Sequence, residues 1–130
     1  MADSKRTHRQ ILEFSLAFPG AYEDHPWEET VVKVNKKVFI FLGSEASPSW
    51  PGMTVKLRDS HEMGLGIPGA EPTGYGLGKS GWVDIPFGVR PPPLGVLKDL
   101  VDESYRLVAP RRLVAELDAA TASRSRRSPD

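Results

Sequence analysis

The sequence predicts an α+β fold, in which helices pack on one face of an antiparallel sheet to give a single two-layer domain. The chain has 130 residues, enough for one hydrophobic core. Apolar residues recur at helical spacing near both ends of the chain, and β-branched and aromatic runs separated by short turns lie between them. Strands grouped in this way favour antiparallel pairing, and they predict the order α-β-β-β-α-β-β-α.

The first predicted elements are a helix and a hairpin. Residues 5–18 form the helix, which a Pro-Gly pair ends, and its buried face has the three-and-four spacing of Ile11, Phe14 and Phe18. Residues 30–34 and 37–42 then flank the two-residue Asn-Lys turn and predict an antiparallel hairpin. Residues 37–42 are apolar at every position but the first, so strict alternation places Phe39 and Phe41 on one face and leaves both faces to be covered.

A third strand, a short helix and a long helix follow. Residues 53–57 have strand composition, and Asp59 or Ser60 caps a short helix that ends near Leu65. Residues 82–86 form the last strand, and three prolines precede a helix over residues 94–108. Residues 111–117 add a final short turn. The domain is therefore expected to span residues 1–118, and residues 119–130 are expected to form a disordered polar and basic tail.

The glycine-rich stretch at residues 74–82 has two opposite interpretations. Residues 76–81 satisfy G-x-G-x-x-G, the pattern of loops that hold a pyrophosphate at a helix N-terminus. That motif requires a buried strand before it and a helix within it, whereas here a Pro/Gly-rich loop precedes and a strand follows. The context therefore favours a glycine-rich hairpin over a phosphate loop.

Several short motifs in a fixed order resemble the MmcQ/YjbR family. The glycine-rich stretch contains a Gly-Tyr, Leu, Lys and Trp pattern, and the long helix ends with a Ser-Tyr pair. Residues 18–24 resemble the start of that family, as do residues 37–39 after the turn, so that the likeness covers residues 8–110. The residues that carry the pattern are Gly74, Tyr75, Leu77, Lys79, Trp82, Ser104 and Tyr105.

The resemblance implies the same order of elements and a DNA-binding function, and it supplies no catalytic residues and no cofactor. At Gly78, Ser80 and Gly81, relatives more often have asparagine, arginine or histidine, so this chain lacks some of their polar groups. Because the family supplies no catalytic residues, an enzymatic role is not favoured, and the missing polar groups count against nucleic-acid binding by this chain.

Cations and aromatic residues on the predicted strands and turns fit a DNA partner, because they can contact phosphates and stack on bases. They also fit an ordinary solvent-exposed sheet. The residues expected to contact nucleic acid are Lys33, Lys37, Lys56, Lys79 and Trp82. The alternative is a module that binds a small molecule or a protein in an apolar pocket, with the lining residues Trp27, Phe39, Tyr75 and Trp82.

A third hypothesis is an enzyme that uses the acidic segment at residues 22–29. Four carboxylates and His25 lie in this segment, but their spacing matches no metal-binding motif, so a solvated acidic loop is favoured and no metal is expected. The 17 basic and 17 acidic side chains balance, so any polyanion must bind to a local patch. The absence of cysteine and of a long apolar run leads us to expect a cytoplasmic protein that does not span a membrane.

Overall fold

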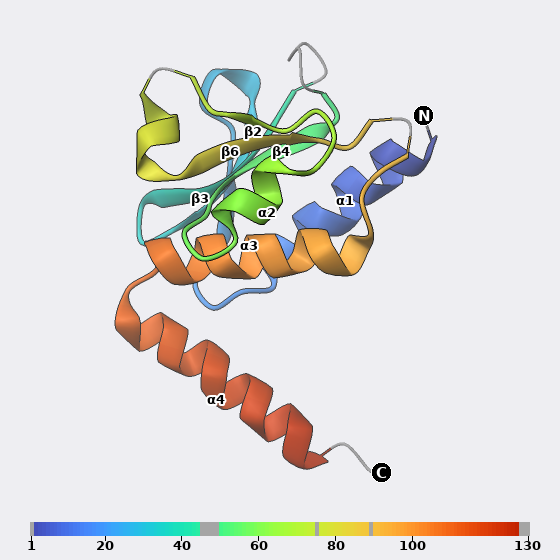
Figure 1. Cartoon of the computed structure of the whole chain (residues 1–130). Coiled ribbons are helices and arrows are strands. Elements are labelled where there is room, and N and C mark those ends of the chain that lie inside the picture. The colour runs from blue at the N-terminus through green and yellow to red at the C-terminus, as the bar shows by residue number, and fades with distance from the viewer. Residues whose placement is uncertain (1, 45–49, 75, 89, 128–130) are drawn as a thin grey trace.

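The structure is a computed structural model that describes residues 2–44, 50–74, 76–88 and 90–127. It contains a six-stranded antiparallel sheet with the strand order β1-β2-β3-β4-β6-β5, which confirms the α+β fold (Figure 1). The strands are β1 (Tyr22–Asp24), β2 (Thr30–Val34), β3 (Lys37–Gly43), β4 (Gly52–Lys56), β5 (Glu71–Pro72) and β6 (Trp82–Pro86). The α-helices are α1 (Ala2–Leu16), α2 (His61–Leu65), α3 (Leu94–Val108) and α4 (Arg111–Arg127), and the 3-10 helices are η1 (Pro26–Glu28) and η2 (Leu77–Ser80).

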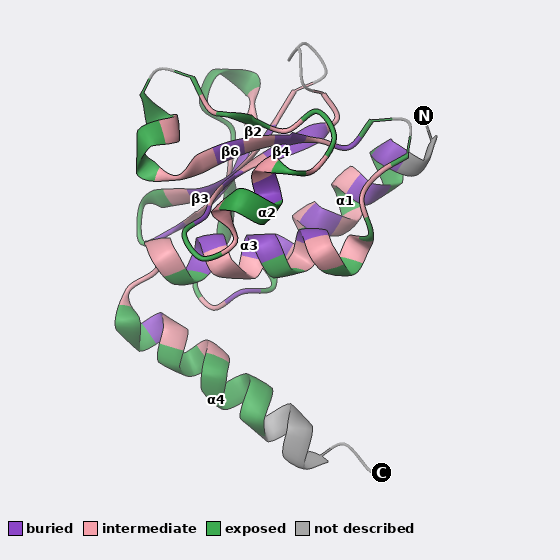
Figure 2. Ribbon diagram, viewed as in Figure 1, coloured by how far each residue is buried: buried purple, intermediate pink, exposed green. Residues whose placement is uncertain are grey.

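One face of the sheet is covered by helices. Helix α3 packs on β3 and β4, and α1 packs beside it against α3 and the strands β2, β3 and β4. Buried side chains therefore gather between the sheet and these two helices, as the purple segments of Figure 2 show. This packing forms a two-layer domain with a single core.

The β2–β3 hairpin forms as the sequence predicts. Asn35 and Lys36 have φ angles of 51° and 68°, and Val34 pairs with Lys37 directly beside them. Positive φ at both central residues is what a type I′ turn requires, and this turn matches the twist of the two strands. Asparagine tolerates this conformation better than most residues do, which explains why a turn without glycine still forms.

A β-bulge in β3 makes one sequence prediction wrong. Val32 pairs with Ile40 but Lys33 pairs with Val38, so Phe39 is an extra residue on β3. Phe39 is fully buried on the helical side, where its ring lies 5.2 Å from that of Tyr105. Phe41 contacts Trp82 instead, so the two phenylalanines do not share a face as strict alternation predicts.

The Ser-Tyr pair near the end of α3 fastens this helix to the rest of the domain. The buried hydroxyl of Ser104 accepts a hydrogen bond from the backbone N–H of Lys56 at 2.9 Å and donates one to the carbonyl oxygen of Phe39. It thereby bridges β3 and β4 beyond the last residues that pair directly. The hydroxyl of Tyr105 donates to the carbonyl oxygen of Pro19 at 2.6 Å, which fixes the chain between α1 and β1.

The glycine-rich stretch is the loop of a hairpin. Glu71 pairs with Asp84 and Pro72 with Val83, and the backbone N–H of Thr73 donates to the carbonyl oxygen of Trp82 at 3.1 Å. Helix η2 occupies the loop between these strands. The hairpin interpretation is therefore correct, and no α-helix begins within the G-x-G-x-x-G pattern.

Two predictions along the chain need correction. The acidic segment was expected to be a solvated loop, but part of it forms the short strand β1, which pairs with β2. The chain from Ala119 was expected to be disordered, but α4 continues to Arg127 and projects away from the sheet (Figure 1). Alanine and arginine have high helix propensity, which sustains this helix where no apolar period is visible. Arg106 of α3 also pairs with Asp118 of α4 at 2.8 Å.

Candidate functional site

The sheet face opposite α1 and α3 is not covered by a helix among the described residues. Val55 of β4 and Val83 of β6 are fully buried in the core, so their neighbours along each strand point to the other side. We call this side the open face. It is made up of Tyr22, Asp24, Val31, Lys33, Val38, Phe41, Thr54, Lys56, Trp82 and Asp84.

Two aromatic rings lie together on the open face. The rings of Phe41 and Trp82 are 5.4 Å apart and meet edge to face, and both side chains are partly exposed. Lys56 is the direct cross-strand partner of Trp82. Residues paired in this way have Cβ atoms about 5 Å apart, so the Lys56 side chain leaves the sheet beside the aromatic pair.

Asp84 and Lys33 show how much of the charge on the open face is already paired. One carboxylate oxygen of Asp84 accepts hydrogen bonds from the hydroxyls of Thr54 at 2.7 Å and Thr73 at 2.8 Å. Lys33 forms an ion pair with Asp24 at 2.8 Å, which raises the pKa of Lys33 and lowers the pKa of Asp24. Lys33 therefore lies on the predicted surface, but its positive charge is already paired with Asp24.

A group of lysine and arginine side chains lies at one end of the sheet. Ile40 pairs with Val55 in antiparallel register, so the beginning of β3 lies next to the end of β4. The backbone N–H of Leu57 donates to the carbonyl oxygen of Gly81 at 2.9 Å, which brings η2 to the same end. We call this region the basic end, and it carries Lys36, Lys37, Lys56, Arg58 and Lys79.

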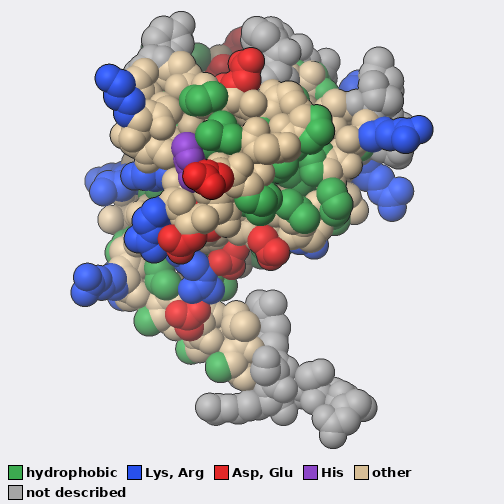
Figure 3. Space-filling model, in the orientation of Figure 1, with side chains coloured by type: hydrophobic (Ala, Val, Ile, Leu, Met, Phe, Trp, Pro, Cys, Tyr) green, Lys and Arg blue, Asp and Glu red, His purple; other side chains and the backbone are tan. Residues whose placement is uncertain are grey.

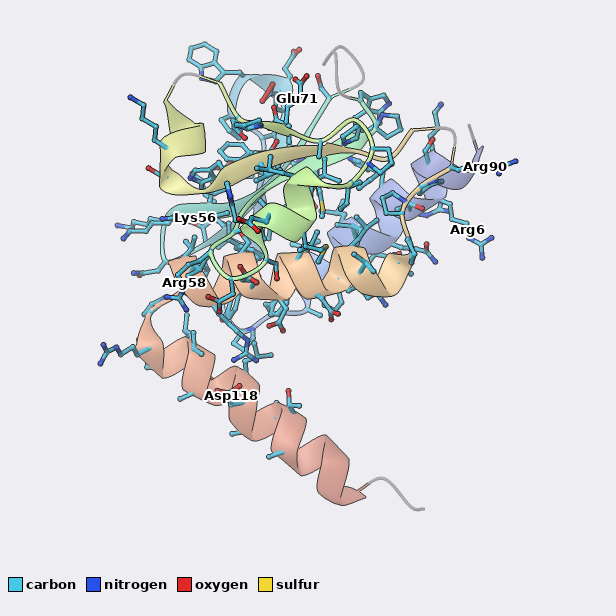
Figure 4. The ribbon with its side chains drawn as sticks, in the orientation of Figure 1. Arg6, Lys56, Arg58, Glu71, Arg90 and Asp118 are labelled. Atoms are coloured by element: carbon cyan, nitrogen blue, oxygen red, sulfur yellow. The ribbon has the colours of Figure 1, made fainter. Side chains whose placement is uncertain are left out.

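The figures show where the basic end lies. Blue side chains gather on the left side of Figure 3, with some red ones between them, and a purple histidine side chain lies on the same side next to a red one. Figure 4 shows the labelled Lys56 and Arg58 on this side, opposite the labelled Arg6 and Arg90. Lys56 and Lys79 form no ion pair with any residue that the structure describes.

The predicted nucleic-acid residues therefore divide into two groups. Lys56 and Trp82 lie side by side on the open face, and Lys79 lies near them on η2. Lys37 is exposed at the tip of the β2–β3 hairpin, on the same strand face as the buried Val34, so it belongs to the basic end but not to the open face. Two residues that were not among the predicted site residues also lie here: Phe41 is on the open face and Arg58 is at the basic end.

The predicted apolar pocket is not formed by its described members. Phe39 is fully buried in the core and so cannot line a surface pocket, whereas Trp82 lies on the opposite face. Trp27 is 95% exposed, with a φ of 55°, at the tip of the β1–β2 connection. Tyr75 lies outside the described residues. Phe39 and Trp82 therefore do not line one pocket.

The acidic segment does not converge on a cleft. Glu23 and His25 pair with each other at 2.7 Å in an exposed position, and Asp24 points to Lys33. Within residues 2–44, 50–74, 76–88 and 90–127, no group of three or more His, Asp or Glu side chains is placed to hold a metal ion. This geometry gives no support to the hypothesis of an enzyme built on this segment.

In a comparison with protein-family models, the YjbR family model matches residues 16–107. The chain belongs to the YjbR family. The match runs from the end of α1 to the end of α3, so it includes the open face and the Ser104-Tyr105 pair but not α4. None of the curated proteins compared with the chain matches it.

Membership in the YjbR family confirms the resemblance read from the sequence. In the structure, some residues of the family pattern are buried, such as Ser104 and Tyr105, and others lie at the surface, such as Lys79 and Trp82. In the parts of the chain that the structure describes, no helix has both the length and the apolar character to cross a membrane.

Proposed function

We propose that this YjbR domain binds DNA, with the open face contacting bases and the basic end contacting phosphates. The observation that supports the proposal best is the Phe41–Trp82 pair on the uncovered side of the sheet, with Lys56 directly across from Trp82. Aromatic side chains beside cations on an exposed sheet suit unpaired nucleotides, because bases stack on the rings while ammonium groups contact phosphates.

Each residue has a distinct role in this proposal. Trp82, supported by Phe41, provides the stacking surface, and Lys56 and Lys79 contact phosphates on one side of it. Lys37 extends the positive region at the hairpin tip, and Lys33 contributes less because Asp24 already pairs with it. The role is binding and not catalysis, and a DNA partner agrees with the cytoplasmic location expected from the sequence.

Local charge must provide the affinity, because the 17 basic and 17 acidic side chains of the whole chain balance. Three lysine–phosphate contacts on a single strand predict that log Kobs falls with log salt concentration with a slope of about −2. A single-stranded oligonucleotide is expected to bind more tightly than a duplex of the same length, since stacked duplex bases cannot reach Trp82.

Fluorescence anisotropy tests this proposal. Labelled single-stranded and duplex DNA are titrated with the full chain at low and at physiological salt. Trp82→Ala is expected to weaken single-strand binding about tenfold or more, because stacking contributes ~1–3 kcal/mol per base. Lys56→Gln and Lys79→Gln are each expected to reduce the salt slope by about 0.7.

Lys98→Gln is the matched control, because Lys98 lies on α3, on the covered side of the sheet, with its ammonium 5.3 Å from the ring of Phe14. It should leave both affinity and salt slope unchanged. If neither DNA form binds with salt dependence at micromolar protein, the proposal is wrong.

A second candidate function is that of a ligand-binding module, which a groove between α2, α3 and the end of β6 favours. This groove has a volume of about 670 Å³ and is lined mostly by apolar residues, with Met63, Ile67, Phe87 and Val96 among them. Such a volume is within the range of small-molecule sites. Saturable binding of an apolar fluorescent probe, lost in Met63→Glu, would favour this function, and unchanged probe fluorescence would count against it.

A further inference from the structure

A second cavity at the basic end has a different character from the apolar groove. It has a volume of about 530 Å³ and lies between η2, the chain after β4 and the end of α3. No aspartate or glutamate is among its lining residues. We call it the η2 cavity and define it by Lys56, Arg58, His61, Lys79, Ser80 and Gly81.

The backbone holds the cations of the η2 cavity together. Lys56 and Arg58 flank Leu57, whose backbone N–H donates to the carbonyl oxygen of Gly81 at 2.9 Å, and Lys79 precedes Gly81 by two residues. Gly81 has a φ of +97°, and a Cβ there would collide with the carbonyl oxygen of Leu57. Only glycine allows this close approach, so the sequence fixes Lys79 beside the cations that follow β4.

The charge in the cavity is only partly compensated by neighbouring residues. Arg58 forms one contact, from its Nε to Asp59 at 3.3 Å, and both side chains are about three-quarters exposed. Such an exposed pair contributes little and leaves the guanidinium able to contact another anion. Acidic side chains line a separate depression on the far side of Arg58. Arg58 therefore lies between the basic lining of the η2 cavity and a mainly acidic surface.

His61 adds an observation that is independent of the charges. Its Nε2 atom is buried and has no hydrogen-bond partner among the residues that the structure describes. Buried side-chain nitrogens nearly always have a partner. His61 lines the η2 cavity, as does Ser80, whose hydroxyl can donate to an oxygen of a bound anion.

Side chains and not the backbone would hold such an anion. The backbone N–H groups of Gly78, Lys79 and Gly81 donate to carbonyl oxygens of Thr73, Gly76 and Gly78, all within the loop. They are therefore not free to surround a phosphate as in the loops that the G-x-G-x-x-G pattern resembles. This distinguishes the cavity from a dinucleotide-binding loop.

We propose that the η2 cavity binds a phosphate group. A phosphate monoester carries about −1.5 to −2 charges at pH 7 and presents three strong acceptor oxygens, which suits a cavity lined by three cations and the hydroxyl of Ser80. The cavity volume leaves room for part of the group that carries the phosphate. The phosphate could belong to a DNA strand on the open face or to a small phosphorylated molecule, so this inference does not depend on the proposed function.

The test is an NMR titration of the full-length, ¹⁵N-labelled chain at constant ionic strength. Inorganic phosphate and a nucleoside 5′-monophosphate are each added to about 20 mM, a range that detects weak binding. The expected result is a saturable shift of the amide signals of Lys79, Ser80 and Gly81. No shift at these residues would overturn the inference.

Three variants show whether the shift reports the proposed site. Arg58→Gln and Lys79→Gln are each expected to weaken phosphate binding about fivefold, which is ~1 kcal/mol per lost contact. Lys37→Gln is the matched control, because Lys37 is exposed at the same end of the sheet but does not line the cavity. Equal affinity in all three variants would overturn the inference. Because Arg58 and Lys79 are exposed, these substitutions should not disturb folding.

An oligothymidylate without terminal phosphates separates the two sources. If it competes with inorganic phosphate for the cavity, a DNA backbone phosphate is the natural ligand. If it does not bind while phosphate does, the inference holds for a small phosphorylated molecule and the proposed DNA function fails. If it binds while phosphate does not, DNA binding is supported and the η2 cavity inference is overturned.

Discussion

The two faces of the sheet are built by the same strands but have different tasks. On the covered face, Val32, Ile40, Val55 and Val83 are fully buried beneath α1 and α3. On the open face, the residues next to them include aromatic, charged and hydroxyl side chains besides two valines. This difference indicates that the stability of the domain comes mainly from the covered side.

The family pattern follows the same division. Ser104 and Tyr105 serve the covered side, where they connect α3 to β3, β4 and the chain after α1. Lys79 and Trp82 belong to the exposed side. Substitution on the two sides should therefore produce two distinct phenotypes, loss of stability and loss of binding.

The largest expected contrast is between Phe39→Ala and Phe41→Ala. Phe39 is fully buried among Phe18, Tyr105 and the rest of the core, so its truncation should cost about 3–5 kcal/mol of unfolding free energy. Phe41 is partly exposed, and its loss should cost about 1–2 kcal/mol because less apolar area is removed. Urea unfolding measures both, and equal losses would contradict the division between the faces.

A smaller contrast is expected between Gly81→Ala and Gly76→Ala. Both glycines have positive φ, so both substitutions carry a backbone cost of about 1 kcal/mol. Only at Gly81 would the new Cβ collide with the carbonyl oxygen of Leu57, whereas nothing lies within 4 Å at Gly76. Gly81→Ala should therefore lose about 2–3 kcal/mol in total. Thermal unfolding that gives the same loss at both positions would show that η2 is not held tightly against the chain after β4.

Ser104→Ala should cost about 1–3 kcal/mol, because it leaves the backbone N–H of Lys56 and the carbonyl oxygen of Phe39 without their shared partner. The control is Thr121→Ala on α4, where an exposed hydroxyl bonds only to the carbonyl oxygen of Leu117. Chemical denaturation should find almost no effect there. If Ser104→Ala leaves the free energy of unfolding unchanged, the bridging role of the Ser104 hydroxyl is contradicted.

The smallest effect concerns the pH dependence of stability at Glu103. Its carboxylate accepts hydrogen bonds from the backbone N–H groups of Arg58 at 2.7 Å and Ser60 at 3.2 Å. Burial raises the pKa of Glu103, but these hydrogen bonds outweigh burial, so the pKa lies below its ordinary value of 4.5. The ionised form therefore stabilises the folded state above pH 4.5 and loses this effect as the pH falls through the lowered pKa.

Glu103→Gln should consequently be less stable than the natural chain at pH 7, by less than about 1 kcal/mol because the carboxylate remains accessible to water. The difference should close as the pH falls below 4.5. Unfolding curves at a series of pH values measure it. A difference that widens in acid would contradict the assigned hydrogen bonds.

Much of the fold could be predicted because local patterns determine it. The helix over residues 94–108 and the strand over residues 82–86 have the bounds that apolar spacing and composition indicate. The bulge at Phe39 could not be predicted, because an extra residue in a strand depends on its partner and on the packing of Tyr105. Strand β1 lacks strand composition, and α4 lacks an apolar period in its second half.

The candidate site could be predicted only as separate residues. Lys56, Lys79 and Trp82 have recognisable chemistry, but the contact of Lys56 with Trp82 depends on the register of β4 and β6. Lys79 joins Arg58 and His61 in the η2 cavity because Gly81 allows η2 to approach the chain after β4. No local sequence signal for that approach exists beyond the glycine itself.

Chemical-shift mapping with a single-stranded oligonucleotide at low salt tests the central claim most directly. Binding through the open face predicts that perturbed amides cluster at the ends of β4 and β6 around Lys56 and Trp82, in η2, and near Phe41. Amides of α1 and of the covered face of α3 should remain unchanged. Perturbations centred on these helices, or none at all, would contradict the assignment of binding to the open face.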